Sequence, residues 1–266
     1  MTCAPPSYIY RGLFLSDEVL KVNPALEPIV EKYGQLLKGV DHWFARSATA
    51  AGNAVQCGKG CSSCCRGLFD ITLLDAFFLR QGIDRLAPRL HEVVLARIAV
   101  QLQTLKLIWP SMAPPYVINV LQEEELDRLM PEEDETPCPL LGDDGLCLVY
   151  ENRPMTCRLH GIPLVDLSGE FFHDEWCTCN FKDEDPLERH DLRWEFRDLF
   201  KTELSLFQEF TGALLNQKIN ELDTLIPLAA LIDFDGFDWK SWWRVSEATL
   251  RNAGFPENQR DTPPPD

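Results

Sequence analysis

The sequence lacks a membrane-spanning segment, an export signal and a run of basic residues that could bind nucleic acid. The longest strongly apolar run, Leu225–Ile232, is interrupted by Pro227 and is far too short to span a bilayer. The first six residues show neither the charged nor the apolar region of a secretory signal, so we expect a cytoplasmic protein. Basic residues are scarce, with 25 Lys and Arg against 42 Asp and Glu and a net charge of −17. A surface of that sign repels phosphates and anionic lipids, so we expect no nucleic-acid or membrane partner. A protein partner is possible, and the sequence does not identify it.

Familiar catalytic motifs are missing as well. The sequence contains no Gly-rich phosphate loop, no nucleophile elbow and no glycine-rich methyl-donor loop after a strand. Disorder of the whole chain is a poor interpretation, because 45% of the residues are hydrophobic and 25% are charged, as in ordinary globular proteins. The sequence therefore predicts a folded protein and leaves open whether it is an enzyme.

Apolar residues recur mostly at helical spacing, which predicts a mainly α fold. The expected helices cover residues 24–51, 73–81, 84–109, 120–130, 186–220 and 239–252. The clearest of them, 84–109, carries one apolar stripe formed by Leu90, Val94, Ile98, Leu102 and Leu105. Thr72 followed by Asp75 resembles a capping box at a helix start. Short runs on both sides of Leu167-Ser168-Gly169 predict a small β-hairpin over 162–173.

Composition divides the chain into four segments. Residues 1–54 form an N-terminal helical segment, and 55–180 form a cysteine-cluster metal-binding domain with a helical insert at about 72–130. Residues 181–255 form a C-terminal helical region, and the polar, Pro-rich residues 256–266 are expected to be disordered. The fold must therefore bring together two irregular cysteine-rich loops from either side of the insert.

Cysteine is the residue type that carries most information. The ten cysteines include a first cluster, Cys57-Gly-Lys-Gly-Cys61-Ser-Ser-Cys64-Cys65, and a second, wider set formed by Cys138, Cys147, Cys157 and Cys177. Small residues within the first cluster let the backbone wrap tightly around an ion. Thiolates are soft ligands, which favour zinc, iron–sulfur or copper(I) over magnesium and calcium. These eight cysteines are the predicted metal ligands, enough for two four-thiolate sites or for one site with spare thiols.

Two other interpretations of the cysteines are weaker. Buried hydrophobic cysteines are common singly, but they do not explain four within nine residues. Disulfides of an exported protein would need an export signal, which is not visible. The adjacent side chains of Cys64 and Cys65 diverge, so they suit two different metal ions better than one. Cys3 and Cys179 look like extras, and His160 is either a further ligand or a core histidine.

The motifs resemble a known family. They are Cys57–Cys65, Leu74-Asp75-Ala76 and the segment Cys138-Pro139-Leu140-Leu141…Gly145-Leu146-Cys147-Leu148-Val149-Tyr150…Arg153-Pro154-Met155-Thr156-Cys157-Arg158. Together they look like the CxxCxxCC cysteine-cluster family, also called the YkgJ family, which is described as zinc- or iron-chelating domains. The resemblance covers about residues 55–180 and implies that the eight predicted ligands match the family's cysteines, with a first gap of three residues in place of two.

The leading prediction is a metal-binding protein whose centre is structural, redox-active or involved in metal handling. An iron–sulfur cluster is favoured over zinc because the second set of cysteines is spread too irregularly for paired zinc knuckles, although zinc tolerates wide spacings. Arg153 and Arg158 bracket Cys157, where they either offset the negative charge of the centre or pair with surface carboxylates. Flagellin lysine N-methylases carry a similar domain, so the resemblance implies an alternative, a protein lysine N-methyltransferase that uses S-adenosylmethionine.

Overall fold

The computed structural model describes residues 24–58, 60–131 and 133–252, so Cys3 and the tail predicted to be disordered lie outside the described residues. Within these ranges the chain is mainly helical, which confirms the predicted fold class. The helices are α1 (Glu27–Ala51), α2 (Leu73–Asp84), α3 (Pro88–Ile108), α4 (Glu123–Leu129), α5 (Met155–Leu159), α6 (Phe196–Leu215), α7 (Ile226–Ala229) and α8 (Trp239–Asn252). Two-stranded sheets pair β1 (Asp70–Thr72) with β4 (Asp223–Leu225) and β2 (Leu164–Val165) with β3 (Phe171–His173). None of the described helices is long and apolar enough to cross a membrane.

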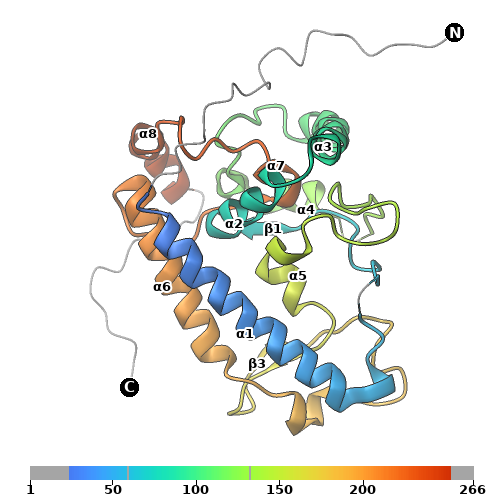
Figure 1. Ribbon diagram of the computed structural model, residues 1–266. Helices are drawn as coiled ribbons and strands as arrows, with labels where there is room; N and C mark the ends of the chain where they lie inside the picture. The colour runs from blue at the N-terminus through green and yellow to red at the C-terminus, as the bar shows by residue number, and fades with distance from the viewer. Residues whose placement is uncertain (1–23, 59, 132, 253–266) are drawn as a thin grey trace, which may run out of the picture.

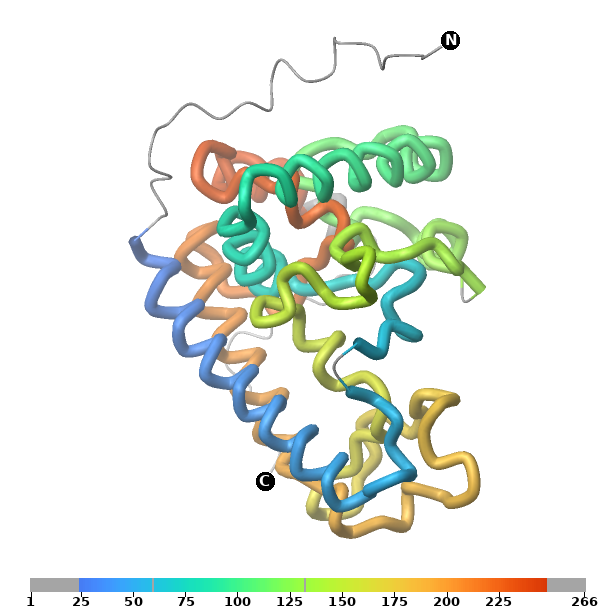
Figure 2. Tube along the Cα trace, turned by 45° about the vertical axis from the view of Figure 1, so that its right-hand side comes forward, coloured from blue at the N-terminus to red at the C-terminus, as the bar shows by residue number. Residues whose placement is uncertain are grey.

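The long helix α1 runs beside α6 along one side of the molecule (Figures 1 and 2). It starts at Glu27 and has a proline in its first turn, where a missing N–H is harmless. Its apolar residues recur every three or four positions, and the buried ones are Ile29, Val30, Tyr33, Leu37, Val40 and Trp43. At the surface, Lys32 Nζ lies 3.1 Å from a carboxylate oxygen of Glu209 and joins the two helices. The apolar stripe therefore fixes which face of α1 turns inward.

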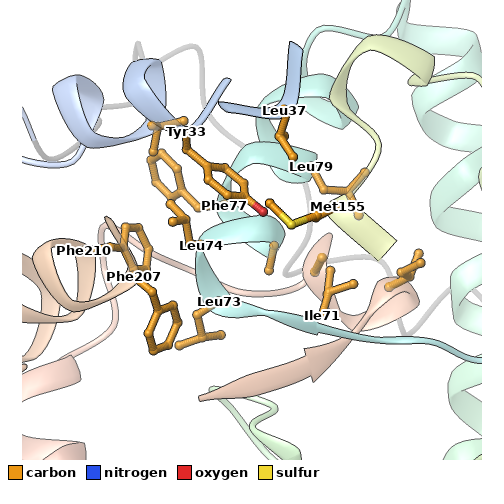
Figure 3. Packing of buried hydrophobic residues seen from close by; sticks show 14 of the residues in the cluster. Tyr33, Leu37, Ile71, Leu73, Leu74, Phe77, Leu79, Met155, Phe207 and Phe210 are labelled. Atoms are coloured by element: carbon orange, nitrogen blue, oxygen red, sulfur yellow. The ribbon is translucent and has the colours of Figure 1, made fainter. Parts of the chain in front are cut away.

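Large aromatic side chains fill the core between α1, α2 and α6 (Figure 3). The ring of Phe77 on α2 packs edge-on against Phe210 on α6, with centroids 5.8 Å apart. Near the other end of α1, Trp43 packs against Phe196 at 4.9 Å, and its Nε1 donates a hydrogen bond to the Leu192 carbonyl at 2.8 Å. These contacts hold the three helices in fixed positions, from which the cysteine loops extend.

A short antiparallel pairing of β1 with β4 was not predicted from the sequence. Asp70 faces Leu225 in this pair, so a strand from late in the chain holds the end of the first cysteine loop. Directly after β1, the Thr72 side chain accepts a hydrogen bond from the Asp75 N–H at 3.1 Å, which confirms the predicted helix start. The first cysteine loop is therefore anchored where it enters α2.

The expected helix 84–109 is shorter than predicted. Asp84 is the last residue of α2, and α3 begins at Pro88, where the ring suits a first turn but not a helix interior. The predicted stripe is correct for Val94 and Ile98, which are buried, but wrong for Leu90, which is exposed. The chain turns between α2 and α3, and this turn carries the start of α3 away from the core.

The expected helix 186–220 is also wrong at both ends. Residues 186–188 and 190–192 form separate 3-10 turns, and only α6 is α-helical. The guanidinium of Arg189 holds these turns by hydrogen bonds to Asp191 at 2.6 Å and to Glu184 at 2.9 Å. At the other end, Asn216 adopts a left-handed conformation with φ 63° and stops the helix. Local ion pairs and a helix-stopping Asn thus override the apolar periodicity.

The segment 138–160, predicted to be loop-like, contains a 3-10 turn over 150–152 and the helix α5. After it, the predicted hairpin is confirmed in shorter form, with Leu164 of β2 facing His173 of β3. The second cysteine-rich segment is therefore more regular than its sequence indicated.

Candidate metal centre

The two cysteine-rich loops lie against each other and are joined through their backbones. The Cys138 N–H donates to the Cys65 carbonyl at 2.9 Å, and the Gly67 N–H donates to the Thr136 carbonyl at 2.8 Å. Gly67 has φ +73°, a conformation that side chains rarely adopt, and an added Cβ would lie 3.1 Å from a backbone oxygen. The loops therefore meet despite the helical insert between them.

A tight turn sets the position of two cysteines in the second loop. The Gly142 N–H donates to the Leu146 carbonyl at 2.7 Å, and the Leu148 N–H donates to the Leu140 carbonyl at 2.9 Å. Gly145 supplies the positive φ of +77° that the turn requires. As a result, Cys138 and Cys147 sit near the two ends of one small hairpin-like turn.

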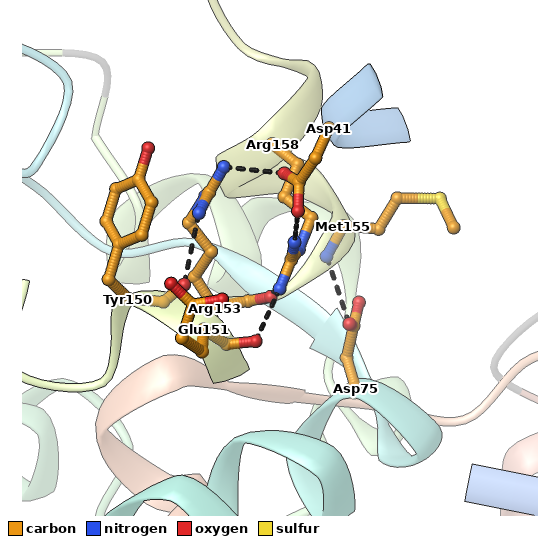
Figure 4. A network of polar contacts seen from close by, with 7 residues as sticks. All are labelled: Asp41, Asp75, Tyr150, Glu151, Arg153, Met155 and Arg158. Atoms are coloured by element: carbon orange, nitrogen blue, oxygen red, sulfur yellow. Dashed lines mark hydrogen bonds and ion pairs between the residues drawn. The ribbon is translucent and has the colours of Figure 1, made fainter. Parts of the chain in front are cut away.

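The helix α5 carries Cys157 and is tied to α1 by a carboxylate that the sequence did not single out. One oxygen of Asp41 accepts a hydrogen bond from Arg153 at 2.7 Å, and the other accepts from Arg158 (Figure 4). Arg158 also donates to the Glu151 carbonyl at 2.8 Å, and its side chain is only 2% exposed. The two arginines thus bind a carboxylate of α1, a residue that the pattern around Cys157 could not reveal.

A second buried carboxylate holds the start of α5. Asp75 Oδ1 accepts a hydrogen bond from the Met155 N–H at 3.0 Å (Figure 4). The same oxygen accepts a second hydrogen bond from the Tyr33 hydroxyl at 2.8 Å. Burial raises the pKa of Asp75 to about 6, although both hydrogen bonds act in the opposite direction. α5 is therefore positioned from two sides by acidic residues of α1 and α2.

Seven of the predicted ligands line a single pocket with a volume of about 160 Å³. They are Cys57, Cys61, Cys64, Cys65, Cys138, Cys147 and Cys157. Arg153, Arg158 and His160 line the same pocket, and much of the remaining wall is apolar, including Phe44 and Ile226. Cys177, the eighth predicted ligand, is buried outside this lining. The structure therefore gathers the cysteines of both loops around one space.

Cys177 belongs to a neighbouring group of thiols that includes Cys179, a residue left without a role by the sequence. Asn180 Nδ2 donates to Cys57 Sγ at 3.2 Å and to the Gly161 carbonyl at 2.7 Å. Gly161 has φ +114°, and an added Cβ would lie 3.0 Å from Cys57 Sγ and 3.9 Å from the Cβ of Cys177. Asn180 and Gly161 thus support the thiols from outside the pocket, although neither carries a metal-ligand signature in the sequence.

Burial keeps most of these thiols protonated in the metal-free chain. It raises the pKa of Cys57 and of Cys138 to about 11 in each case. The adjacent pair behaves asymmetrically, because a hydrogen bond from the Cys64 thiol raises the pKa of Cys64 and lowers the pKa of Cys65. A metal must therefore displace protons when it binds, which makes its affinity depend on pH.

The chemistry of the donor set fits a soft metal ion or cluster. The nine described cysteines are all free thiols, which are the ligands that zinc and iron–sulfur clusters prefer. Within the described ranges, however, no three Cys, His, Asp or Glu side chains already form a set that could hold a metal ion. Binding would therefore have to draw sulfur atoms closer together, and the eight-cysteine ligand set stays a prediction.

The thiols come from two loops that are hydrogen-bonded to each other, and Asp41 and Asp75 hold the helix that carries Cys157. Together they form a cysteine-rich site of the kind that binds metals. Residues 56–180 match the family model CxxCxxCC, described as "Putative zinc- or iron-chelating domain". No curated protein and no solved structure matches the chain. Metal binding is thus supported both by the family and by the arrangement of the thiols.

Proposed function

We propose that the chain holds an iron–sulfur cluster in the cysteine pocket, in a structural or redox role. The observation that carries the proposal is the gathering of seven cysteines around one space of about 160 Å³. A single buried water needs only about 10–15 Å³ of such space. The pocket therefore has room for several iron and sulfide atoms, and a cluster of this kind would engage more of its thiols than one zinc ion.

The residues of the pocket have distinct parts in this proposal. Cys138 and Cys147 come from the tight turn, Cys157 comes from α5, and the first loop supplies the adjacent pair. A bound iron–sulfur cluster supplies one-electron chemistry, at a potential that depends on nearby charge and solvent exposure. Burial raises the pKa of Cys147, while Arg153 and Arg158 oppose that rise by favouring the thiolate. A reducing, cytoplasmic setting suits the free thiols.

Zinc is the second candidate, because the thiols fall into two neighbouring groups. One group lies at the tight turn and includes Cys138 and Cys147. The other lies near Asn180 and includes Cys177 and Cys57, of which Cys57 also lines the pocket. Two separate four-coordinate zinc ions would use such a division. The methyltransferase alternative gains no comparable support, since the described residues form only two-stranded sheets and thus no α/β site for a methyl donor.

The test is the metal content of the full chain purified without oxygen. We expect brown protein that contains iron and acid-labile sulfide in similar amounts, and a Cys147→Ser variant that has lost most of both. Cys3→Ser is the matched control and should keep its colour. Colourless protein with zinc and without sulfide would replace the cluster with the second candidate. Protein that binds neither metal would refute both.

A further inference from the structure

The outer face of α3 is apolar although it faces away from the core. α3 lies at the edge of the molecule, next to α7 (Figures 1 and 2), and buries Val94, Ile98 and Leu105. On its opposite side Val100 is 67% exposed and Leu107 is 82% exposed. Exposed apolar patches of this kind mark contact sites more often than single exposed residues do.

The exposed residues form a stripe whose spacing is symmetric. Val93, Ala96, Val100, Thr104 and Leu107 are all exposed and follow one another at intervals of three, four, four and three residues. At 3.6 residues per turn these five positions stay on one narrow side of the helix. The stripe therefore has Val100 at its centre, and its spacing is the same toward both ends of the helix.

We propose that this stripe is the contact between two copies of the chain, packed as antiparallel α3 helices about a two-fold axis at Val100. Such an axis places Val100 against Val100 of the second copy, and Val93 against its Leu107. It also places Ala96 near Thr104 of the second copy, so small side chains lie one turn on either side of the axis. A self-complementary patch is what a two-fold homodimer requires.

The residues beside the stripe obey the same symmetry. Glu92 and Lys106 lie on one flank, and Leu90 and Ile108 lie on the other, all of them exposed. In an antiparallel pair each flank meets the same flank of the other helix, so Glu92 faces Lys106 and Leu90 faces Ile108. The midpoints of both pairs fall at residue 99, one position from the centre of the stripe. Charge complementarity and apolar contact therefore select the same register and the same antiparallel direction.

The charge of α3 also suits contact between two acidic molecules. Each copy carries a net charge of −17, so most faces repel each other. α3 is an exception, since Arg89 and Lys106 outnumber its one acidic residue, Glu92, even with Arg97 paired to Asp143. The two copies thus meet where their repulsion is least.

The size of the contact predicts a weak dimer. The 21 residues of α3 make a rod of about 31 Å. A single pair of such helices lies at or below the lower end of the roughly 1,200–2,000 Å² that stable interfaces bury. We therefore expect a dimer that dissociates on dilution.

Sedimentation of the reduced full chain over the micromolar concentration range tests the contact. We expect a monomer–dimer equilibrium that Val100→Asp weakens by more than about a hundredfold, because two carboxylates then face each other in an apolar contact. Val245→Asp is the matched control, since Val245 on α8 is also exposed, at 79%, and should leave the equilibrium unchanged. Both variants should retain the helical circular dichroism of the parent.

A charge exchange tests the register without touching the apolar residues. Glu92→Lys alone and Lys106→Glu alone should each weaken the dimer about two- to tenfold, and the double variant should restore it. A chain that stays monomeric throughout would overturn the proposal. A dimer that survives Val100→Asp would place the contact elsewhere and would overturn it as well. An intact dimer without restoration in the double variant would refute the antiparallel register.

Discussion

The bond between Asp41 and the two arginines carries the sharpest prediction about stability. Asp41→Asn keeps the shape of the side chain but leaves the guanidinium of Arg158 without a counter-charge. That side chain is 2% exposed, whereas Asp41 is 31% exposed, so water can replace the lost carboxylate only in part. Breaking a buried ion pair in this way costs about 3–5 kcal/mol. We expect the lower end of this range, because Arg158 keeps its hydrogen bonds to the carbonyls of Arg153 and Glu151.

The assays are urea unfolding and thermal unfolding of the reduced, metal-free chain, both followed by circular dichroism. A loss of about 3 kcal/mol corresponds to a fall in Tm of about 6–12 °C for a chain of this size. Asp143→Asn is the matched control, since Asp143 pairs with Arg97 at a similar distance, 2.7 Å, but is 97% exposed. An exposed pair contributes only about 0–1 kcal/mol. Equal losses in the two variants would show that the Asp41 contact does not fix α5.

Three further predictions concern the residues around the thiols. Asp75→Asn should keep both hydrogen bonds, which share one oxygen, and should remove a pH dependence of stability. Because burial raises the pKa of Asp75 from 3.8 to about 6, the parent should lose about 2 kcal/mol relative to the variant as the pH rises from about 4 to 6. Urea melts across that range check it, and a constant difference would count against it. Asn180→Ala removes a donor to Cys57 and should speed metal release to a chelator about tenfold, whereas an unchanged release rate would assign Asn180 no part in the site. Gly161→Ala should lower the free energy of unfolding by about 1–3 kcal/mol in the same melts, since φ at Gly161 is +114°. Gly58→Ala is the control, with no atom near its added Cβ, and should lower that free energy much less. Similar losses in the two variants would contradict the prediction.

Helices and cysteine clusters could be predicted from the sequence because their signals are local. Apolar spacing marks the buried face of α1, and the density of thiols marks the metal-binding loops. The pairing of β1 with β4 could not be predicted in this way, since Asp70 and Leu225 meet only after the whole chain has folded. Each strand is only three residues long, too short for an alternating pattern to show.

The supporting residues of the site were missed for a similar reason. Asp41 lies in the middle of a helix, where an acidic residue ordinarily faces water, and its role depends on arginines more than a hundred positions away. Asn180 follows Cys179 directly, so its place next to a cysteine was the one available signal. Arg189 holds two 3-10 turns ahead of α6 through ion pairs that helical periodicity does not record. Long-range polar contacts therefore account for most of what the sequence could not reveal.

The backbone hydrogen bond between Cys65 and Cys138 joins positions that are 73 residues apart in the chain. A metal held by thiols from both loops would bind the folded chain, where the two loops meet, more tightly than the unfolded chain. Its binding free energy would therefore add to the free energy of folding. The helical insert, α2 through α4, would then be restrained at both of its ends by the metal-bound loops. Metal loading would thus stabilise helices that never touch the metal.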